Sequence, residues 1–106
     1  MRGVEYTAGM SGALVYILRC ADGAYYTGLT HRTPEERESE HNQGLDRQAW
    51  TFTRRPVTLV WSAHFDNIVE AIATERRIKG WRREKKDALI EGAFESLPGL
   101  ASRAQR

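Results

Sequence analysis

Short apolar runs separated by turn residues predict three β-strands. Residues 14–20 (LVYILRC) are apolar and rich in strand formers, and residues 21–23 (ADG) have the composition of a turn. Residues 24–30 (AYYTGLT) complete a hairpin. Residues 57–63 (VTLVWSA), set apart by Pro56, form the third strand.

A helix start follows the hairpin. Thr33 suits the N-cap, Pro34 the first helical position, and Glu36 can close a capping box. This helix is expected to reach about residue 42, with Gly44 ending it.

Two more helices follow the third strand. Asp66 or Asn67 caps one that runs from residue 68 to about 80, and the last runs from residue 82 to about 93. The β-β-α-β-α-α order predicts an α+β domain, in which helices flank one small three-stranded antiparallel sheet.

The turn of the hairpin decides which way two tyrosines face. A two-residue turn pairs residues whose numbers sum to 45 and puts Tyr16 and Tyr26 on opposite faces of the sheet. A three-residue turn with Gly23 in the left-handed conformation pairs residues whose numbers sum to 44. Tyr16 then opposes Gly28, Tyr26 opposes Leu18, and both hydroxyls share a face. The sequence permits either geometry.

The chain of 106 residues, 41% of them hydrophobic, is long enough for one compact core and too short for two. We expect a flexible leader over residues 1–12, the folded domain over 13–94 and a frayed tail over 95–106. No apolar run is long enough for a membrane span, and the leader lacks the features of a signal peptide. The single Cys20 fits a protein of the reducing cytoplasm.

The formal net charge is only +2, so the distribution of charge carries more information than its sum. Seven of the eleven residues from 76 to 86 are Lys or Arg. Such a block can follow a phosphate backbone, or it can be the solvated face of a helix.

Glu75 interrupts an apolar helix face. At 100° per residue it falls near the centre of a stripe formed by Ile68, Ala71, Ile72 and Ile78. A buried carboxylate is costly unless it is paired, protonated or bound to a metal. The alternative is a glutamate at the edge of the stripe that reaches water or an arginine.

The helix that starts at Pro34 has no apolar stripe at all. Arg37 and His41, four residues apart, share one face of it. A helix this polar is either fully exposed or presents charge into a site, and the planar fork of an arginine suits phosphate oxygens.

Together these residues resemble the GIY-YIG nuclease superfamily. LVY at residues 14–16 stands in the place of GIY, and YTG at residues 26–28 in the place of YIG. Arg37 and His41 match the R-x-x-x-H helix of the family, and Glu75 matches its single helical glutamate. The likeness is greatest to the small single-domain bacterial members and covers residues 14–90. Glu38 departs from the pattern, where an apolar residue is usual, and the loop at residues 31–32 has one extra residue.

The resemblance implies hydrolysis of a phosphodiester bond with one divalent metal ion. Glu75 would bind the ion, Mg²⁺ or alternatively Mn²⁺, and Arg37 would hold the scissile phosphate. Tyr16 is the candidate general base, with Tyr26 assisting it. An ordinary tyrosine has a pKa near 10, so the metal and the arginine would need to lower it. His41 would orient a tyrosine hydroxyl or share the proton transfer.

The expected partner is nucleic acid, and DNA is the form that the resemblance implies, in structure-specific cleavage linked to repair or recombination. A partner protein would supply targeting. Trp50, Phe52 and Trp81 offer rings for stacking on bases, although Trp81 suits core packing better. The expected phosphate contacts are Arg54, Arg55, Arg76, Arg77, Lys79, Arg82 and Arg83.

Three other functions are compatible with parts of the pattern. The same fold can bind nucleic acid without cutting it. It can also serve as a structural domain in which Glu75 is paired with a nearby arginine. A metal site of Cys20, His31, His41 and His64 lacks any recognised ligand spacing.

Overall fold

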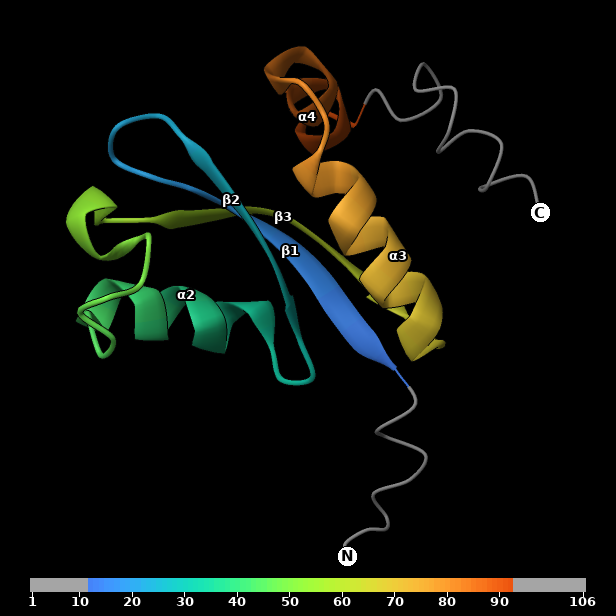
Figure 1. The fold of residues 1–106 in the computed structure, drawn as a ribbon, viewed down its shortest axis with the longest axis horizontal. Coiled ribbons are helices and arrows are strands. Elements are labelled where there is room, and N and C mark those ends of the chain that lie inside the picture. Colours follow the sequence, from blue (N-terminus) through green and yellow to red (C-terminus); the bar gives the residue numbers. More distant parts are fainter. Residues whose placement is uncertain (1–11, 93–106) are drawn as a thin grey trace, which may run out of the picture.

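The structure, a computed structural model, describes residues 12–92 as a three-stranded antiparallel sheet with helices on both of its faces (Figure 1). Strand β1 (Ala13–Arg19) lies between β2 (Tyr25–Thr30) and β3 (Thr58–Phe65). The predicted α+β class and order of elements are confirmed. The predicted leader, apart from Gly12, and the stretch from residue 93 onward lie outside the described residues.

The helices are α2 (Pro34–Gln43), α3 (Ile68–Lys79) and α4 (Arg83–Ile90), with a short 3-10 helix η1 (Phe52–Arg54) before β3. The capping box of Thr33 with Glu36 and the left-handed Gly44 after α2 are confirmed. Asn67, and not Asp66, caps α3, because its side chain accepts the backbone N–H groups of the first turn.

Several boundaries differ from the prediction by one or two residues. β1 begins and ends one residue earlier, and β3 continues to Phe65 because that residue pairs with Ala13. β2 begins at Tyr25 instead of residue 24, and α4 begins at Arg83 with Arg82 as its N-cap. The 3-10 helix was not predicted, since residues 45–55 show no period.

The hairpin has the three-residue turn. The backbone N–H of Cys20 donates to the carbonyl of Ala24 at 2.8 Å, and Gly23 has a φ of +89°, a conformation that glycine adopts without strain. Tyr16 consequently pairs with Gly28 and Leu18 with Tyr26, so both tyrosines lie on one face of the sheet.

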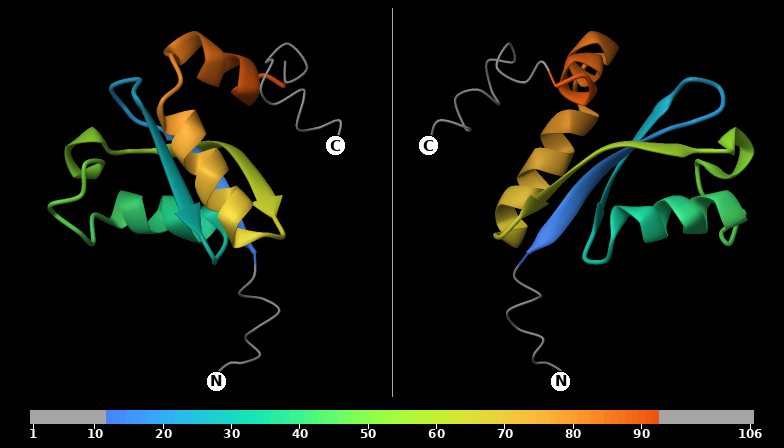
Figure 2. Two further views of the ribbon diagram at one scale, coloured as in Figure 1. Left: turned by 45° about the vertical axis from the view of Figure 1, so that its right-hand side comes forward. Right: turned by 180° about the vertical axis from the view of Figure 1, so that it is seen from behind.

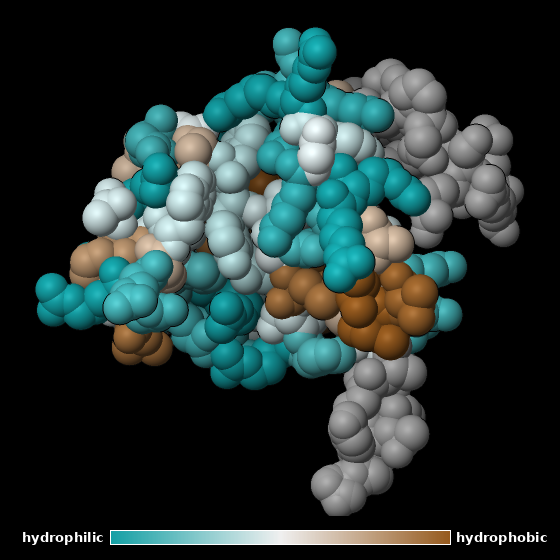
Figure 3. Space-filling view, viewed as in Figure 1, coloured by the Kyte–Doolittle hydropathy of each residue, from teal (hydrophilic) through white to brown (hydrophobic). Residues whose placement is uncertain are grey.

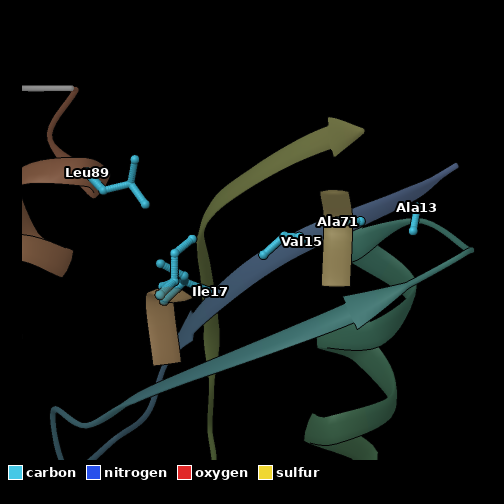
Figure 4. Packing of buried hydrophobic residues seen from close by; sticks show 6 residues of the cluster. Ala13, Val15, Ile17, Ala71 and Leu89 are labelled. Carbon is cyan, nitrogen blue, oxygen red and sulfur yellow. The ribbon is translucent and has the colours of Figure 1, made fainter. Parts of the chain in front are cut away.

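Each face of the sheet has its own buried cluster. Val15 and Ile17 of β1 pack against Ala71 of α3 and Leu89 of α4 (Figure 4). The opposite face holds a smaller cluster of Tyr16, Leu18, Cys20 and Val57. α3 therefore covers the first face and α2 lies on the side of Tyr16 (Figure 2).

Hydrogen bonds, not apolar packing, attach α2 to the sheet. The amide of Asn42 donates to the carbonyl of Val57 at 2.9 Å and accepts the N–H of Val57 at 2.6 Å. The Glu38 carboxylate accepts the N–H of Leu59 at 2.7 Å, beside a bulge in the pairing of β3 with β1. The polar face of α2 is thus partly a docking face, and Glu38 has a structural use where the family pattern has an apolar residue.

Hydrophilic side chains cover the later part of α3 and α4 on the face seen in Figure 3, and a hydrophobic patch lies over the start of α3. Val69, in the first turn of α3, is 69% exposed. No helix within residues 12–92 has the length and apolar character needed to cross a membrane.

Candidate active site

Tyr16 occupies its position because its partner across the hairpin is a glycine. The Tyr16 ring lies over Gly28, and a Cβ added there would come within 2.5 Å of Cζ and the hydroxyl oxygen of Tyr16. Only glycine leaves this space free. The sequence offered the Tyr16–Gly28 pairing as one of two registers. It did not show this requirement, which depends on the direction of the tyrosine side chain.

Arg37 reaches the Tyr16 hydroxyl from α2. Its Nε donates to the hydroxyl oxygen at 3.4 Å, and one terminal nitrogen pairs with the Glu40 carboxylate. Glu40 also pairs with Arg32, so it is held between two arginines. The hydrogen bond to Tyr16 raises the pKa of Arg37, which therefore stays positively charged.

The pKa of Tyr16 is raised above its ordinary value of 10.0, chiefly because its hydroxyl is buried. The hydrogen bond from Arg37 acts in the opposite direction but is the weaker influence. The arginine is thus placed as expected for a group that favours the phenolate, yet it does not by itself lower the pKa.

Tyr26 stands at the centre of an aromatic cluster on the same face. Its ring lies 6.3 Å from that of Tyr16, 5.0 Å from that of His41 and 6.2 Å from that of Trp50. Burial lowers the pKa of His41, and the positive charge of Arg37 lowers it further. The Nδ1 atom of His41 is 2.6 Å from the hydroxyl of Thr51, a residue that sequence reasoning did not select.

A pocket of about 380 Å³ opens beside these groups. Tyr26 lies on one side of it, Arg37, Glu40 and His41 line it from α2, and the loop at residues 44–51 completes the wall. Trp50, on this loop, is 46% exposed. The pocket offers a positive charge and aromatic surface in one place, which suits a phosphodiester with its base, while the buried Tyr16 lies behind its lining residue Arg37.

Glu75 does not line this pocket. Its side chain is only 14% exposed, as its place in the apolar stripe predicts, and its carboxylate pairs with Lys79 at 2.8 Å. α3 contacts β2, the strand that carries Tyr26. The structure therefore groups Tyr16, Tyr26, Arg37 and His41 and places Glu75 on the neighbouring helix α3.

The predicted phosphate contacts divide into two sets. Arg54 pairs with Asp22 at 3.1 Å and lies 3.9 Å over the Trp50 ring. Arg55 and Arg83 lie in the same way over Phe52 and Tyr25, at 4.1 and 4.0 Å, and Arg83 also pairs with Asp87. The second set is exposed and consists of Arg76, Arg77 and Arg82. Within residues 12–92 none of these three arginines is part of an ion pair.

The other predicted residues have separate environments. Trp81 packs against the core cluster under α3. Cys20 is buried in the hairpin, His31 contacts the carbonyl of Gly12, and His64 lies near Asp66. Across residues 12–92, no three His, Cys, Asp or Glu side chains gather into a metal site.

The family model of the GIY-YIG catalytic domain matches residues 12–87. The chain belongs to the GIY-YIG family. This GIY-YIG domain is 45% identical to a UPF0213 protein of Halobacterium salinarum, over 72% of the chain and 96% of the relative. It is 42% identical to a UPF0213 protein of Bacillus pumilus, over 72% of the chain and 76% of the relative.

A solved structure is also similar. The solution NMR structure of a UPF0213 protein from Bacillus halodurans shares 36% sequence identity with this GIY-YIG domain, with a TM-score of 0.49. The match covers 76% of the chain and 83% of the solved one.

Proposed function

We propose that this GIY-YIG domain is a divalent-metal-dependent endonuclease that hydrolyses phosphodiester bonds in DNA. The observation that carries the proposal is the convergence of Tyr16, Tyr26, Arg37 and His41 on one face, from two strands and a helix. The three-residue turn, which the sequence left open, is the geometry that a joint site needs.

Arg37 holds the scissile phosphate. Tyr16 and Glu40 engage its Nε and one terminal nitrogen, which leaves further N–H groups of the guanidinium for phosphate oxygens. Because the donors are fixed before substrate arrives, they can stabilise the charge that develops on the phosphoryl oxygens.

Tyr16 accepts the proton of the attacking water, and Tyr26 orients that water. His41 lies against the Tyr26 ring, and its lowered pKa keeps it neutral. It is a further group beside the two phenols that can exchange a proton. The raised pKa of Tyr16 makes its phenolate scarce at neutral pH, so substrate and cation binding must favour the ionised form.

Glu75 fits a divalent ion by the chemistry of its donor. It offers a hard carboxylate oxygen on a largely buried stem, and it already binds a cationic group, the 55% exposed Lys79, which can move into solvent. A bound Mg²⁺, or Mn²⁺ in its place, would stabilise negative charge on the leaving oxygen. Water and phosphate oxygens would complete its coordination.

The exposed Arg76, Arg77 and Arg82 extend the site along the nucleic acid, together with Lys79 once it leaves Glu75. These contacts are to phosphates, so they give affinity and not sequence readout. We infer a role in structure-specific cleavage during repair or recombination, with a partner protein that brings the domain to its substrate.

A cleavage assay tests the proposal. Branched, flapped, single-stranded and duplex DNA, with the matching RNA, are incubated with the full chain in the presence of Mg²⁺, Mn²⁺ or EDTA. We expect metal-dependent cutting that Arg37→Ala and Glu75→Gln reduce by at least about a hundredfold, and Arg37→Lys by less.

The matched control is Arg47→Ala, an exposed arginine whose guanidinium lies 5.7 Å from the Phe52 ring and outside the pocket lining. It should cut at the wild-type rate. DNA binding without cutting under every condition, unaffected by Glu75→Gln, would show that the domain is a binding module.

A further inference from the structure

Thr51 is a buried residue whose hydroxyl does not cap the short helix that it precedes. It precedes the 3-10 helix η1 at the N-cap, yet its hydroxyl makes no capping hydrogen bond. Its side chain is 1% exposed, and within residues 12–92 the hydrogen-bonding partner of its oxygen is Nδ1 of His41, at 2.6 Å.

A count of hydrogen bonds decides which of these two groups donates. The Nε2 atom of His41 is buried and has no partner in the described part of the chain. If Nδ1 carried the proton, the Thr51 hydroxyl hydrogen would lack an acceptor and the lone pair of Nε2 a donor. If the hydroxyl donates to Nδ1, the Nε2–H alone remains without a partner, and one buried group fewer is unsatisfied.

We propose that Thr51 is a positioning residue that fixes His41 as a neutral imidazole with its proton on Nε2. His41 then serves the proposed active site as a hydrogen-bond donor to an oxygen, either the Tyr26 phenolate or a phosphate oxygen, and not as a general base. The inference rests on the proposed function for the role of His41, but the protonation state stands on geometry alone.

The charged surroundings agree with a neutral ring. Arg37 and Glu40 face His41 from its own helix, and the Tyr26 phenol faces it from β2. Asp46 lines the same pocket from the loop. Burial lowers the pKa of His41 and Arg37 lowers it further, while Glu40 opposes them with the weakest effect. A donor that stays neutral adds no second cation beside Arg37.

Nitrogen-15 NMR of the full chain reads the protonation state directly. The chain has three histidines, so His31→Gln with His64→Gln leaves His41 as the single reporter. Both replaced residues are exposed. At neutral pH we expect the long-range proton–nitrogen pattern of the Nε2–H form. The pattern of the Nδ1–H form, or of a charged ring, would overturn the proposal.

Two substitutions at residue 51 test the part played by the hydroxyl. Thr51→Val keeps the shape and removes the donor, and we expect a mixture of both tautomers. Thr51→Ser should restore the single Nε2–H form. An unchanged tautomer in a folded Thr51→Val protein would refute the positioning role. If Thr51→Val fails to fold, the wild-type and Thr51→Ser spectra still decide which nitrogen carries the proton.

Cleavage is the second readout. Thr51→Val should cut about tenfold more slowly, the equivalent of one lost hydrogen bond, with Thr51→Ser near wild type. If the wild-type chain cuts no nucleic acid, the proposed function fails, while the NMR result still tests the assignment of the proton. Full cleavage by Thr51→Val with a mixed tautomer would refute the donor role of His41.

Discussion

At the scale of single residues, the space above Gly28 is what allows Tyr16 to lie across the hairpin. Gly28→Ala puts a methyl group within 2.5 Å of the phenol, so the ring must move. We expect the free energy of unfolding to fall by about 1–3 kcal/mol. The cleavage rate should fall by more than the increase in unfolded protein can account for. Thermal unfolding and cleavage rates at a temperature where both proteins are folded measure the two effects.

Gly80→Ala is the matched control. An added Cβ at Gly80 meets nothing closer than 3.7 Å, and the backbone there has an ordinary negative φ. This variant should keep its stability and its cleavage rate. Equal losses in the two glycine variants would mean that the Tyr16 ring is not the group that matters.

The pKa of Tyr16 predicts how cleavage depends on pH. Because burial raises this pKa above 10.0, the phenolate fraction grows with pH throughout the neutral and mildly alkaline range. The cleavage rate at substrate concentrations well below saturation, which reports the free protein, should therefore rise with pH between roughly 7 and 9, by close to tenfold per unit. Tyr16→Phe should cut slowly and lose the rise. A flat wild-type profile would exclude Tyr16 as the base.

At the scale of elements, the sequence could predict those features that depend on residues close together in the chain. The capping box of Thr33 and Glu36 was predicted because it depends on contacts within a few residues. For the cap of α3 and the turn at Gly23 the sequence narrowed the choice to two alternatives, and the structure selects Asn67 and the left-handed glycine. The end of β3 could not be found in this way, because Phe65 belongs to the sheet only through its pairing with Ala13.

The same distinction applies to the residues of the candidate site. Tyr16, Tyr26 and Arg37 could be selected because motif spacing carries them. Helical periodicity marked Glu75 but left open whether it is buried or at the edge of the apolar stripe, and the structure shows it 14% exposed and paired with Lys79. Thr51 could not be selected, since it lies in a loop without a period and its use depends on a partner ten residues away. Tertiary contacts alone make it part of the site.

The attachment of α2 gives a prediction at this scale. Asn42→Ala removes both hydrogen bonds to Val57, and the buried backbone groups of Val57 lose their partners. We expect a loss of about 1–3 kcal/mol in unfolding free energy and faster amide exchange at Val57. Gln43→Ala is the control, because Gln43 bonds only to Ser39 on the same helix. Equal stability of the two variants would mean that α2 is held by other contacts.

At the scale of the whole molecule, the positive residues serve two purposes that net charge cannot distinguish. Arg54 lies over Trp50, a residue of the pocket wall, and Arg55 lies over Phe52. Hydrophilic side chains project from the later part of α3, where Arg76 and Arg77 are exposed (Figure 3). The first set should act through stability and the second through binding.

This division predicts different salt dependences for DNA binding. A cation that contacts a phosphate releases a counterion, so its removal makes the slope of log affinity against log salt shallower by about one. Arg76→Ala with Arg77→Ala should reduce the slope by about two at unchanged thermal stability. Arg55→Ala should instead lower the unfolding temperature and leave the slope unchanged. Fluorescence anisotropy of a labelled duplex over a range of salt concentrations measures the slopes. A slope that falls with Arg55→Ala and not with the α3 variant would show that Arg55 contacts the DNA and that Arg76 and Arg77 do not.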